Sequence, residues 1–303
     1  MIIVPGSVNA DLLFQVAELP RPGETVLCPG YVMAGGGKGA NQATAAAKAG
    51  AEVRFVGHVG DDAYGPVLRG LLEQAGVDCG LLAISARPTA IAVIGVDARG
   101  ENAIIVASGA NLDTGAGQVP EELLGPGVTV LCQNEIRPEE TFAALLRARR
   151  AGARAILNMA PAASVPDEVL SALDVLVVNE LEGEVVAGAP GLAAEAVARR
   201  LSERHGLACV VTLGSAGCLA VAPGLAVRVP VLPIRPVDTT GAGDAFVGAL
   251  TAWLDGGAAL DDALRAASVA AACACEAMGA QTAQASRAAI LARLPELPPS
   301  CPL

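Results

Sequence analysis

The chain alternates short runs of β-branched and aliphatic residues with longer segments rich in alanine and leucine. The short runs predict buried strands and the longer segments predict helices. The predicted strands are Ile2–Pro5, Val53–Gly57, Val128–Cys132, Ala155–Asn158, Val175–Val178 and Cys209–Leu213. The predicted helices are Gly39–Ala49, Tyr64–Ala75, Glu139–Ala151, Leu192–His205, Ala242–Trp253 and Leu260–Met278. Strands followed by helices in this order are typical of a parallel sheet covered on both faces.

Two segments interrupt this alternation. Residues 11–32 carry prolines and a glycine between short extended stretches. Residues 89–107 predict two strands, Ala90–Val96 and Ala103–Ala107, joined by an Asp-x-x-Gly connection that suits a hairpin. A small sheet beside an α/β active site often acts as a lid. We therefore expect residues 1–303 to form one α/β domain that carries a lid built from these two segments.

Composition and charge exclude several classes of function. Hydrophobic residues make up 53% and charged residues 17%, so a large core can be buried. The formal net charge of −11 disfavours a nucleic-acid partner. Eight scattered cysteines without a CxxC pair, and only two histidines, do not support a zinc site. The apolar stretches 245–254 and 266–274 are too short to span a bilayer. Without a signal leader, we expect a cytoplasmic protein that binds no membrane.

The most specific string runs from Asp238 to Asp244 and reads Asp-Thr-Thr-Gly-Ala-Gly-Asp, before an apolar helical run. Glycines at a helix start let backbone N–H groups approach a ligand, and the helix N-terminus favours negative charge there. The carboxylate of Asp244 then stands beside an anion site. It is placed to take a proton from a hydroxyl group that attacks the γ-phosphate of a nucleotide. Taken alone, the string also fits a helix that Asp244 merely caps.

A second glycine-rich string, residues 34–43, contains Lys38 and Asn41. It is not a P-loop, because Gly39 stands where a serine or threonine would hold magnesium and the glycine spacing differs. It also lacks the preceding parallel strand of a dinucleotide-binding fingerprint. We interpret it as a helix start at which Lys38 and Asn41 face a polar ligand. The alternative is a glycine turn with an exposed lysine.

Polar side chains follow three of the predicted strands. Asn9 and Asp11 come after the first strand, where α/β sheets bind ligands and where an amide and a carboxylate can hold sugar hydroxyls. Asn179 and Glu182 follow the strand Val175–Val178 and offer oxygen ligands suited to magnesium. The string from 212 to 217 ends another strand and can line a nucleotide pocket. Each group alone also fits an ordinary turn or helix cap.

These strings resemble, in the same order, the ribokinase-like (PfkB-type) carbohydrate kinases. Residues 36–43 are similar to the amino-terminal signature of that family, and residues 238–246 to its carboxyl-terminal signature. Shorter agreements lie between them, at 60–62, 100–102, 109–111 and 179–182. The resemblance covers nearly the whole chain. It implies a three-layer α/β/α sandwich with a central, mostly parallel sheet and a small β-sheet lid.

The resemblance also implies an ATP-dependent, magnesium-using sugar kinase, and the members that phosphorylate D-ribose at O5 fit best. Asp244 would be the catalytic base, with Gly241, Ala242 and Gly243 as the anion hole. The implied sugar contacts are Asn9, Asp11, Gly37, Lys38, Asn41, Glu135 and Asp244. The implied nucleotide contacts are Asn179, Thr212, Gly214, Ser215, Gly217 and Gly243, with Glu182 and Asn179 holding Mg²⁺ through water.

Ribose-phosphorylating members also bind a monovalent cation such as K⁺ and dimerise through the lid. The implied cation ligands here are Asp238, Thr240 and Gly279. Ala283 departs from the family, which has a hydroxyl-bearing cation ligand at this place, and Thr282 is the neighbouring residue that offers a hydroxyl. On the adenine side Ser268 stands near the place of an asparagine or histidine, so no base contact is assigned.

Three alternatives stay open at this point. A kinase for another sugar or a nucleoside would use the same fold, although aromatic residues at 2% leave few rings to stack on a base. A non-catalytic sugar-binding regulator would not need Asp244. An NAD-dependent oxidoreductase would need a dinucleotide fingerprint after the first strand, which the sequence does not contain.

Overall fold

The computed structural model describes all residues 1–303. Its main sheet has ten strands in the order β14-β13-β12-β11-β10-β9-β8-β1-β4-β5. Their bounds are β1 Ile2–Pro5, β4 Val53–Gly60, β5 Val77–Ser85, β8 Thr129–Cys132, β9 Arg154–Asn158, β10 Val175–Asn179, β11 Ala208–Thr212, β12 Cys218–Ala222, β13 Leu225–Val229 and β14 Cys301–Pro302. The strands from β5 to β11 pair in parallel, and β12, β13 and β14 add an antiparallel edge.

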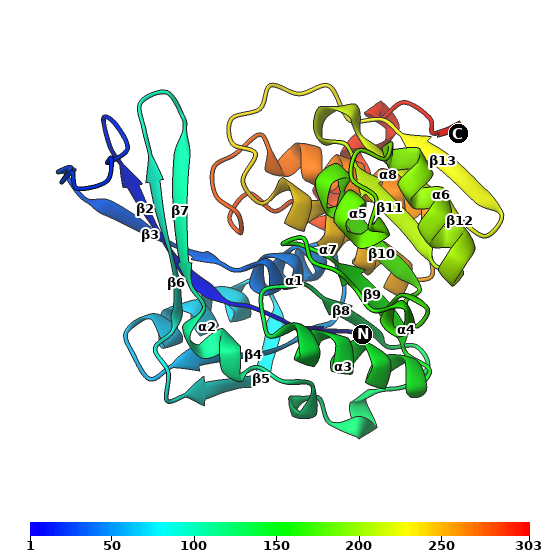
Figure 1. Cartoon of the computed structure of the whole chain (residues 1–303), viewed down its shortest axis with the longest axis horizontal. Helices are drawn as coiled ribbons and strands as arrows, with labels where there is room; N and C mark the ends of the chain where they lie inside the picture. Colours follow the sequence, from blue (N-terminus) through cyan, green and yellow to red (C-terminus); the bar gives the residue numbers. More distant parts are fainter.

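Helices cover both faces of this sheet (Figure 1). They are α1 Lys38–Lys48, α2 Tyr64–Gln74, α3 Pro138–Arg150, α4 Asp167–Leu170, α5 Glu180–Ala187, α6 Ala194–His205, α7 Ala242–Asp255, α8 Leu260–Ala274 and α9 Arg287–Arg293. Short 3₁₀ turns are η1 Gly109–Asp113, η2 Ala116–Gln118, η3 Glu121–Leu123, η4 Gly214–Ala216 and η5 Leu294–Glu296. None of the helices has the length and apolar character needed to cross a membrane.

The strands read as continuous apolar runs because both of their faces are buried. In β1, Ile2 and Val4 belong to a core of 43 buried residues that also contains side chains of α1, α7 and α8. Ile3 points the other way, into a second core of 29 buried residues with side chains of α3 and α6. Successive side chains of a strand point to opposite faces, so one sheet separates two cores. This is the predicted three-layer α/β/α architecture.

A smaller sheet stands apart from the three layers, at the upper left of Figure 1. Its order is β3-β2-β6-β7, with β2 Asn9–Gln15, β3 Tyr31–Gly36, β6 Ala90–Val96 and β7 Asn102–Ala107. Two antiparallel hairpins, β2–β3 and β6–β7, join through a parallel pairing of β2 with β6. The predicted small sheet is therefore present. Its first arm extends beyond 11–32 at both ends, and the proline-containing stretch between β2 and β3 forms no strand.

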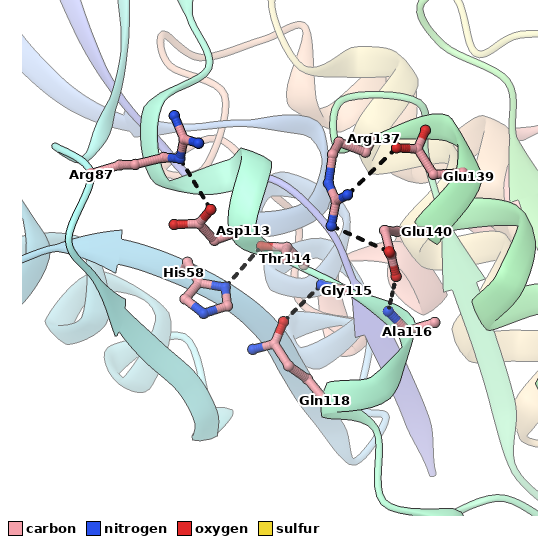
Figure 2. Close-up of polar contacts among 10 residues, drawn as sticks. All are labelled: His58, Arg87, Asp113, Thr114, Gly115, Ala116, Gln118, Arg137, Glu139 and Glu140. Atoms are coloured by element: carbon pink, nitrogen blue, oxygen red, sulfur yellow. Dashed lines mark hydrogen bonds and ion pairs between the residues drawn. The ribbon is translucent and has the colours of Figure 1, made fainter.

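The chain that returns from β7 is tied to the main domain (Figure 2). Three contacts fix it: Arg87 Nε to Asp113 Oδ1 at 3.0 Å, His58 Nδ1 to Thr114 Oγ1 at 3.4 Å, and Ala116 N to Glu140 Oε2 at 2.8 Å. Arg87 precedes β6, His58 lies on β4 and Glu140 lies on α3. Contacts from β4, from α3 and from the loop before β6 therefore converge on one short segment. They hold the two ends of the hairpin β6–β7 against the main domain.

The predicted helix Leu260–Met278 is too long. The helix α8 ends at Ala274, and the following residues form turns up to position 283. Gly279 has a φ of 96°, in the left-handed region that glycine alone enters freely. The apolar residues beyond Ala274 therefore belong to a loop that folds back towards α7.

Candidate active site

A cleft of about 180 Å³ lies at the carboxyl ends of β9, β10 and β11. Its walls are Lys38, Asn158, Ala160, Val177, Val178, Asn179, Glu182, Thr212, Gly241, Gly243, Asp244 and Val247. The carboxyl edge of a parallel sheet is where α/β proteins bind ligands. Seven of the predicted site residues therefore meet in one cavity, from strings that lie far apart in the sequence: Lys38, Asn179, Glu182, Thr212, Gly241, Gly243 and Asp244.

Close packing of α1 against α7 brings the two glycine-rich strings together. A Cβ added at Gly248 of α7 would lie 2.4 Å from Ala45 Cβ and 2.6 Å from the carbonyl oxygen of Gln42, both on α1. The glycine at 248 thus permits the two helices to touch along their backbones. The first turn of α1 is held next to the first turn of α7, which carries Asp244.

The start of α7 depends on Gly241. This residue has a φ of 77°, and a Cβ there would lie 2.8 Å from Ala280 Cα. Both the backbone conformation and the close approach of the loop after α8 require glycine. Gly241 and Gly243 lie on the cleft wall, and their backbone N–H groups have no partner in the protein, whereas the N–H of Ala242 donates to the carbonyl oxygen of Thr239 at 3.2 Å. Unpaired N–H groups at a helix start are the chemistry expected of the predicted anion hole, whose role stays a prediction.

The carboxylate of Asp244 is buried and accepts a hydrogen bond at each oxygen. Asn41 Nδ2 donates to Oδ2 at 2.9 Å, and Gln42 Nε2 donates to Oδ1 at 2.9 Å. Burial raises the pKa of Asp244, while the charge of Lys38 and the two amide donors act against the rise. Asp244 is thus a carboxylate whose basicity is increased inside the cleft. Its side chain caps no backbone group, which excludes the cap interpretation.

Asp11 lies beside the two other carboxyl groups of the site. Burial, followed by the charges of Glu135 and Asp244, raises the pKa of Asp11 to about 7. The backbone of Gly36 packs against this carboxylate, since a Cβ at 36 would lie 2.1 Å from Asp11 Oδ2. Gly37 has a φ of 87°, and a Cβ there would meet the carbonyl oxygen of Ser7 at 2.9 Å. These glycines let β3 turn into α1 directly over Asp11.

Asn9 and Glu135 are held in defined orientations by Asn111, Ser7 and the backbone of Lys38, of which only Lys38 was predicted as a site residue. Asn111 Nδ2 donates to Asn9 Oδ1 at 2.8 Å, which leaves the amide nitrogen of Asn9 free to donate. Glu135 Oε2 accepts from Ser7 Oγ at 2.7 Å and from the backbone N–H of Lys38 at 2.9 Å. Its second oxygen has no partner in the protein. Each residue therefore keeps one polar atom without a protein partner, although neither lies on the wall of the cleft.

Asn179 and Glu182 form a reciprocal cap at the start of α5. Glu182 N donates to Asn179 Oδ1 and Asn179 N donates to Glu182 Oε2, both at 2.8 Å. Both residues nevertheless line the cleft. The cap uses one oxygen of each side chain and leaves Asn179 Nδ2 and Glu182 Oε1 without a protein partner. Burial raises the pKa of Glu182, although the backbone hydrogen bond from Asn179 and the charge of Lys38 lower it.

The loop after β11 contributes less to the cavity than predicted. Thr212 reaches the cleft wall, whereas Gly214, Ser215 and Gly217 are not among its lining residues. Gly214 and Ser215 belong to the turn η4, and Gly217 follows it; Gly214 has a φ of 55° and Gly217 a φ of 84°. A Cβ at Gly217 would meet the carbonyl oxygen of Val229 at 2.2 Å. This glycine therefore serves the packing of the turn against β13.

The loop near Asp238 is held by backbone donors. Thr240 N donates to Asp238 Oδ1 at 2.9 Å and Gly279 N donates to Oδ2 at 3.1 Å. Burial alone would raise the pKa of Asp238, but these hydrogen bonds outweigh it and lower the pKa. The Thr282 hydroxyl donates to the carbonyl oxygen of Met278 at 2.9 Å. Ser268 Oγ donates to the carbonyl oxygen of Pro230 at 2.6 Å, so this side chain joins α8 to the chain after β13.

Three buried side-chain amides near Asp244 were not predicted as site residues from the sequence. Gln42, Gln133 and Asn158 form a chain of hydrogen bonds that ends on Asp244. Gln42 stands inside the amino-terminal signature, next to Asn41. Asn158 ends a predicted strand, which is the same signal that identified Asn179. Gln133 follows β8 but carries no local pattern, because its importance comes from side chains distant in sequence.

Comparison with known proteins agrees with this geometry. The chain matches the family described as pfkB family carbohydrate kinase over residues 1–287. The ribokinase of Haemophilus influenzae is 34% identical over 287 residues, which cover 93% of this chain and 94% of that protein. The crystal structure of ribokinase from Thermotoga maritima has a TM-score of 0.89 at 32% identity, covering 97% and 99% of the two chains. The structure of Arabidopsis thaliana ribokinase complexed with ribose and ATP has a TM-score of 0.85 at 30% identity, covering 97% and 98%.

Proposed function

The chain belongs to the pfkB family of carbohydrate kinases, and we propose that it transfers the γ-phosphoryl group of ATP to the O5 hydroxyl of D-ribose. One observation carries the proposal: a buried carboxylate, Asp244, lies beside the free N–H groups of a helix start in the cleft at the sheet edge. A base next to an anion site is the arrangement that phosphoryl transfer to an alcohol needs. The likeness to ribokinases in sequence and structure supports ribose as the acceptor.

In the proposed reaction, Asp244 accepts the proton of the O5 hydroxyl as that oxygen attacks the γ-phosphorus. The raised pKa of Asp244 favours this step, because a more basic carboxylate is a better proton acceptor. The backbone N–H groups of Gly241 and Gly243 are proposed to donate to the negative charge that develops on the transferred group, whereas the N–H of Ala242, also expected in the anion hole, already donates to the carbonyl oxygen of Thr239 at 3.2 Å. Lys38, on the same cleft wall, adds a positive charge.

The sugar is proposed to bind on the side of the small sheet. The free amide nitrogen of Asn9 donates to a sugar oxygen, while Asp11 and the free oxygen of Glu135 accept hydrogen bonds from sugar hydroxyls. Gly37 lets the backbone approach the sugar closely, and Lys38 and Asn41 complete the polar wall. This set of amide, carboxylate and ammonium groups suits a small polyol, and it contains no aromatic ring to stack on a nucleobase.

The nucleotide is proposed to occupy the part of the cleft lined by Asn179, Thr212 and Gly243. The unpartnered Asn179 Nδ2 fits as a donor to phosphate oxygens, and the free Oε1 of Glu182 fits a water molecule of hydrated Mg²⁺. The metal ion supplies neutralisation of charge on the phosphate groups when it is bound. Gly214, Ser215 and Gly217 are proposed to border the nucleotide outside the cavity.

For a monovalent cation, the residues fit only in part. Asp238 is an ionised carboxylate without an ion pair, next to the backbone of Thr240 and Gly279, and these are the proposed ligands. Ala283 provides no side-chain oxygen, whereas the hydroxyl of Thr282 donates its hydrogen to the carbonyl oxygen of Met278 and keeps its oxygen lone pairs for a cation. We therefore propose this loop as a binding site for K⁺. The proposed transfer of the phosphoryl group does not involve the ion.

The choice of acceptor is tested by a comparison of substrates. We expect kcat/KM for ribose to exceed that for deoxyribose, fructose, ketodeoxygluconate and adenosine by at least about tenfold, which corresponds to about 1.4 kcal/mol of transition-state binding. An ADP-release assay with each acceptor at several concentrations measures this. If another acceptor is preferred by tenfold or more, the chain is a kinase for that acceptor and the assignment to ribose is wrong.

The pH dependence of sugar binding tests the role of Asp11. Because the pKa of Asp11 is raised to about 7, the carboxyl group is neutral below and ionised above that pH. The ionised form accepts hydrogen bonds from sugar hydroxyls, so ribose binding should strengthen by about tenfold between pH 6 and pH 8. Isothermal titration calorimetry measures the dissociation constant. Asp11→Asn should bind ribose more weakly and without this pH dependence; a wild-type profile in this variant would contradict the role.

The small sheet is also a proposed dimer contact. Its outer strand β7 exposes Ile104, Ile105 and Val106, and Tyr31 and Val32 of β3 are more than half exposed as well. These side chains lie on the two edge strands of the small sheet, and exposed apolar residues on a sheet edge are typical of an interaction surface. We therefore propose a homodimer through this sheet. A monomer mass in analytical ultracentrifugation at micromolar concentration would contradict it.

A further inference from the structure

Gln42 touches the carboxylate of Asp244 without reaching the cleft. Its side chain is fully buried and it is absent from the cleft wall. No ligand in the cleft can therefore contact it. Any effect of Gln42 on the reaction must pass through the residues it binds.

We propose that Gln42 is a positioning residue, which fixes the orientation and the proton affinity of the Asp244 carboxylate for phosphoryl transfer. Its Nε2 donates both of its hydrogens, one to Asp244 Oδ1 at 2.9 Å and one to Asn158 Oδ1 at 2.8 Å. Its Oε1 accepts from Gln133 Nε2 at 2.8 Å. The Gln42 amide thus uses both of its donor hydrogens and one of the two lone pairs of its oxygen.

The direction of these hydrogen bonds is set by the main chain. Asn158 Nδ2 donates to the carbonyl oxygen of Val177 on β10 at 3.1 Å, and a backbone carbonyl can only accept. Asn158 must therefore turn its own oxygen towards Gln42, and Gln42 must donate. The same amide group then faces Asp244 as a donor. The backbone carbonyl of β10 therefore determines which group donates and which accepts in each hydrogen bond up to the Asp244 carboxylate.

The second oxygen of Asp244 is held in a similar way. Gln281 Nε2, from the loop after α8, donates to Asn41 Oδ1 at 3.0 Å, so the amide nitrogen of Asn41 faces Asp244. Asn41, however, belongs to the proposed sugar site. Replacing Gln42 removes a hydrogen bond to the Asp244 carboxylate and leaves every proposed ligand-binding residue in place.

The charged groups that act on Asp244 come from α1, from β2 and from the loop after β8. Lys38 of α1 lowers its pKa, whereas Glu135, which follows β8, raises it, and Asp11 of β2 is coupled to it through charge repulsion. All three remain unchanged when Gln42 is replaced. Loss of a donor to the ionised form of a carboxylate raises its pKa. A variant without the donor should therefore need a higher pH to ionise Asp244.

The inference rests on the proposed function, and one set of variants separates the two. Gln42→Met keeps the size of the side chain and removes the donor, and Gln42→Glu replaces the donor by an oxygen that repels Asp244. Thr44→Val is the matched control, since Thr44 is buried on the same helix and its hydroxyl has no partner. The measurements are kcat and KM for both substrates from pH 5 to pH 9, with thermal unfolding of each variant.

We expect Gln42→Met to lower kcat at neutral pH by about 10- to 100-fold, with each KM within about threefold of wild type. The acidic limb of the profile of kcat against pH should shift to higher pH, by about one unit in Gln42→Met and by more in Gln42→Glu. Thr44→Val should keep the wild-type profile. A purely structural role would lower the unfolding temperature and leave the limb in place. If either folded Gln42 variant has the wild-type limb and kcat, while Asp244→Asn is inactive, this inference is wrong and the proposed function stands. If Asp244→Asn is active, the proposed function itself is wrong.

Discussion

Replacing Asp244 by asparagine is expected to lower kcat by about 10²- to 10⁴-fold, because the side chain can no longer accept the proton of the attacking hydroxyl. The change preserves shape and removes the negative charge. Sugar binding should persist, since Asn9, Asp11 and Glu135 are untouched. Steady-state kinetics with ribose and ATP give kcat, and calorimetry gives the dissociation constant for ribose.

This variant also carries a predictable loss of stability. Both oxygens of Asp244 accept amide N–H groups, so the amide nitrogen of an asparagine must face either Asn41 or Gln42, which are donors too. A lost hydrogen bond to a charged group corresponds to about 1.5–3 kcal/mol. Assays should therefore be run well below the unfolding temperature of the variant.

Asp255→Asn is the matched control. Asp255 lies at the other end of α7 and also accepts two hydrogen bonds, from the amino group of Met1 and from Thr129 Oγ1, both at 2.9 Å. Its replacement should lower stability and leave kcat near the wild-type value. If Asp244→Asn and Asp255→Asn retain equal activity, Asp244 is not the base.

Replacing Gly241 by alanine is the second large expected effect. A residue other than glycine at a φ of 77° is strained by about 1–2 kcal/mol, and the added Cβ would lie 2.8 Å from Ala280 Cα. The backbone at the start of α7 must therefore shift. Removing one donor of a preorganised anion hole typically lowers kcat by about 10²- to 10³-fold. We expect a loss of that size, measured with saturating ribose and ATP.

Gly256→Ala provides the comparison for this prediction. Gly256 follows the same helix, has a φ of −73°, and a Cβ there would make only ordinary contacts, the nearest at 3.4 Å. This variant should keep wild-type kcat and stability. A Gly241→Ala enzyme with wild-type kcat would show that the position of the α7 start is not critical for transfer.

The sequence predicted the parallel part of the main sheet well and its edges poorly. Strands such as Val175–Asn179 are apolar on both faces, and that continuous pattern is visible locally. β5 was missed because Asp78 and Gly80 interrupt it, which an edge strand tolerates on its exposed side. The antiparallel strands β12 and β13 were missed as well, since the prediction assumed a helix after each strand.

For the candidate site, sequence strings located the groups that line the cavity but not the groups that orient them. Asp244 and Lys38 lie in glycine-rich strings whose chemistry can be read directly. The pairing of Asn111 with Asn9, and of Gln42 with Asn158, joins residues that are 102 and 116 positions apart. Such partners are fixed by the strand order and by helix packing, which short patterns do not contain.

The position of the new phosphate ester tests the central claim most directly. Wild-type protein incubated with uniformly ¹³C-labelled ribose, ATP and Mg²⁺ should give ADP and one sugar phosphate. In its ¹³C spectrum, coupling to phosphorus should appear on C5 and on its neighbour C4. Coupling centred on C1, or ADP formation without any labelled phosphate ester, would contradict transfer to O5 of ribose.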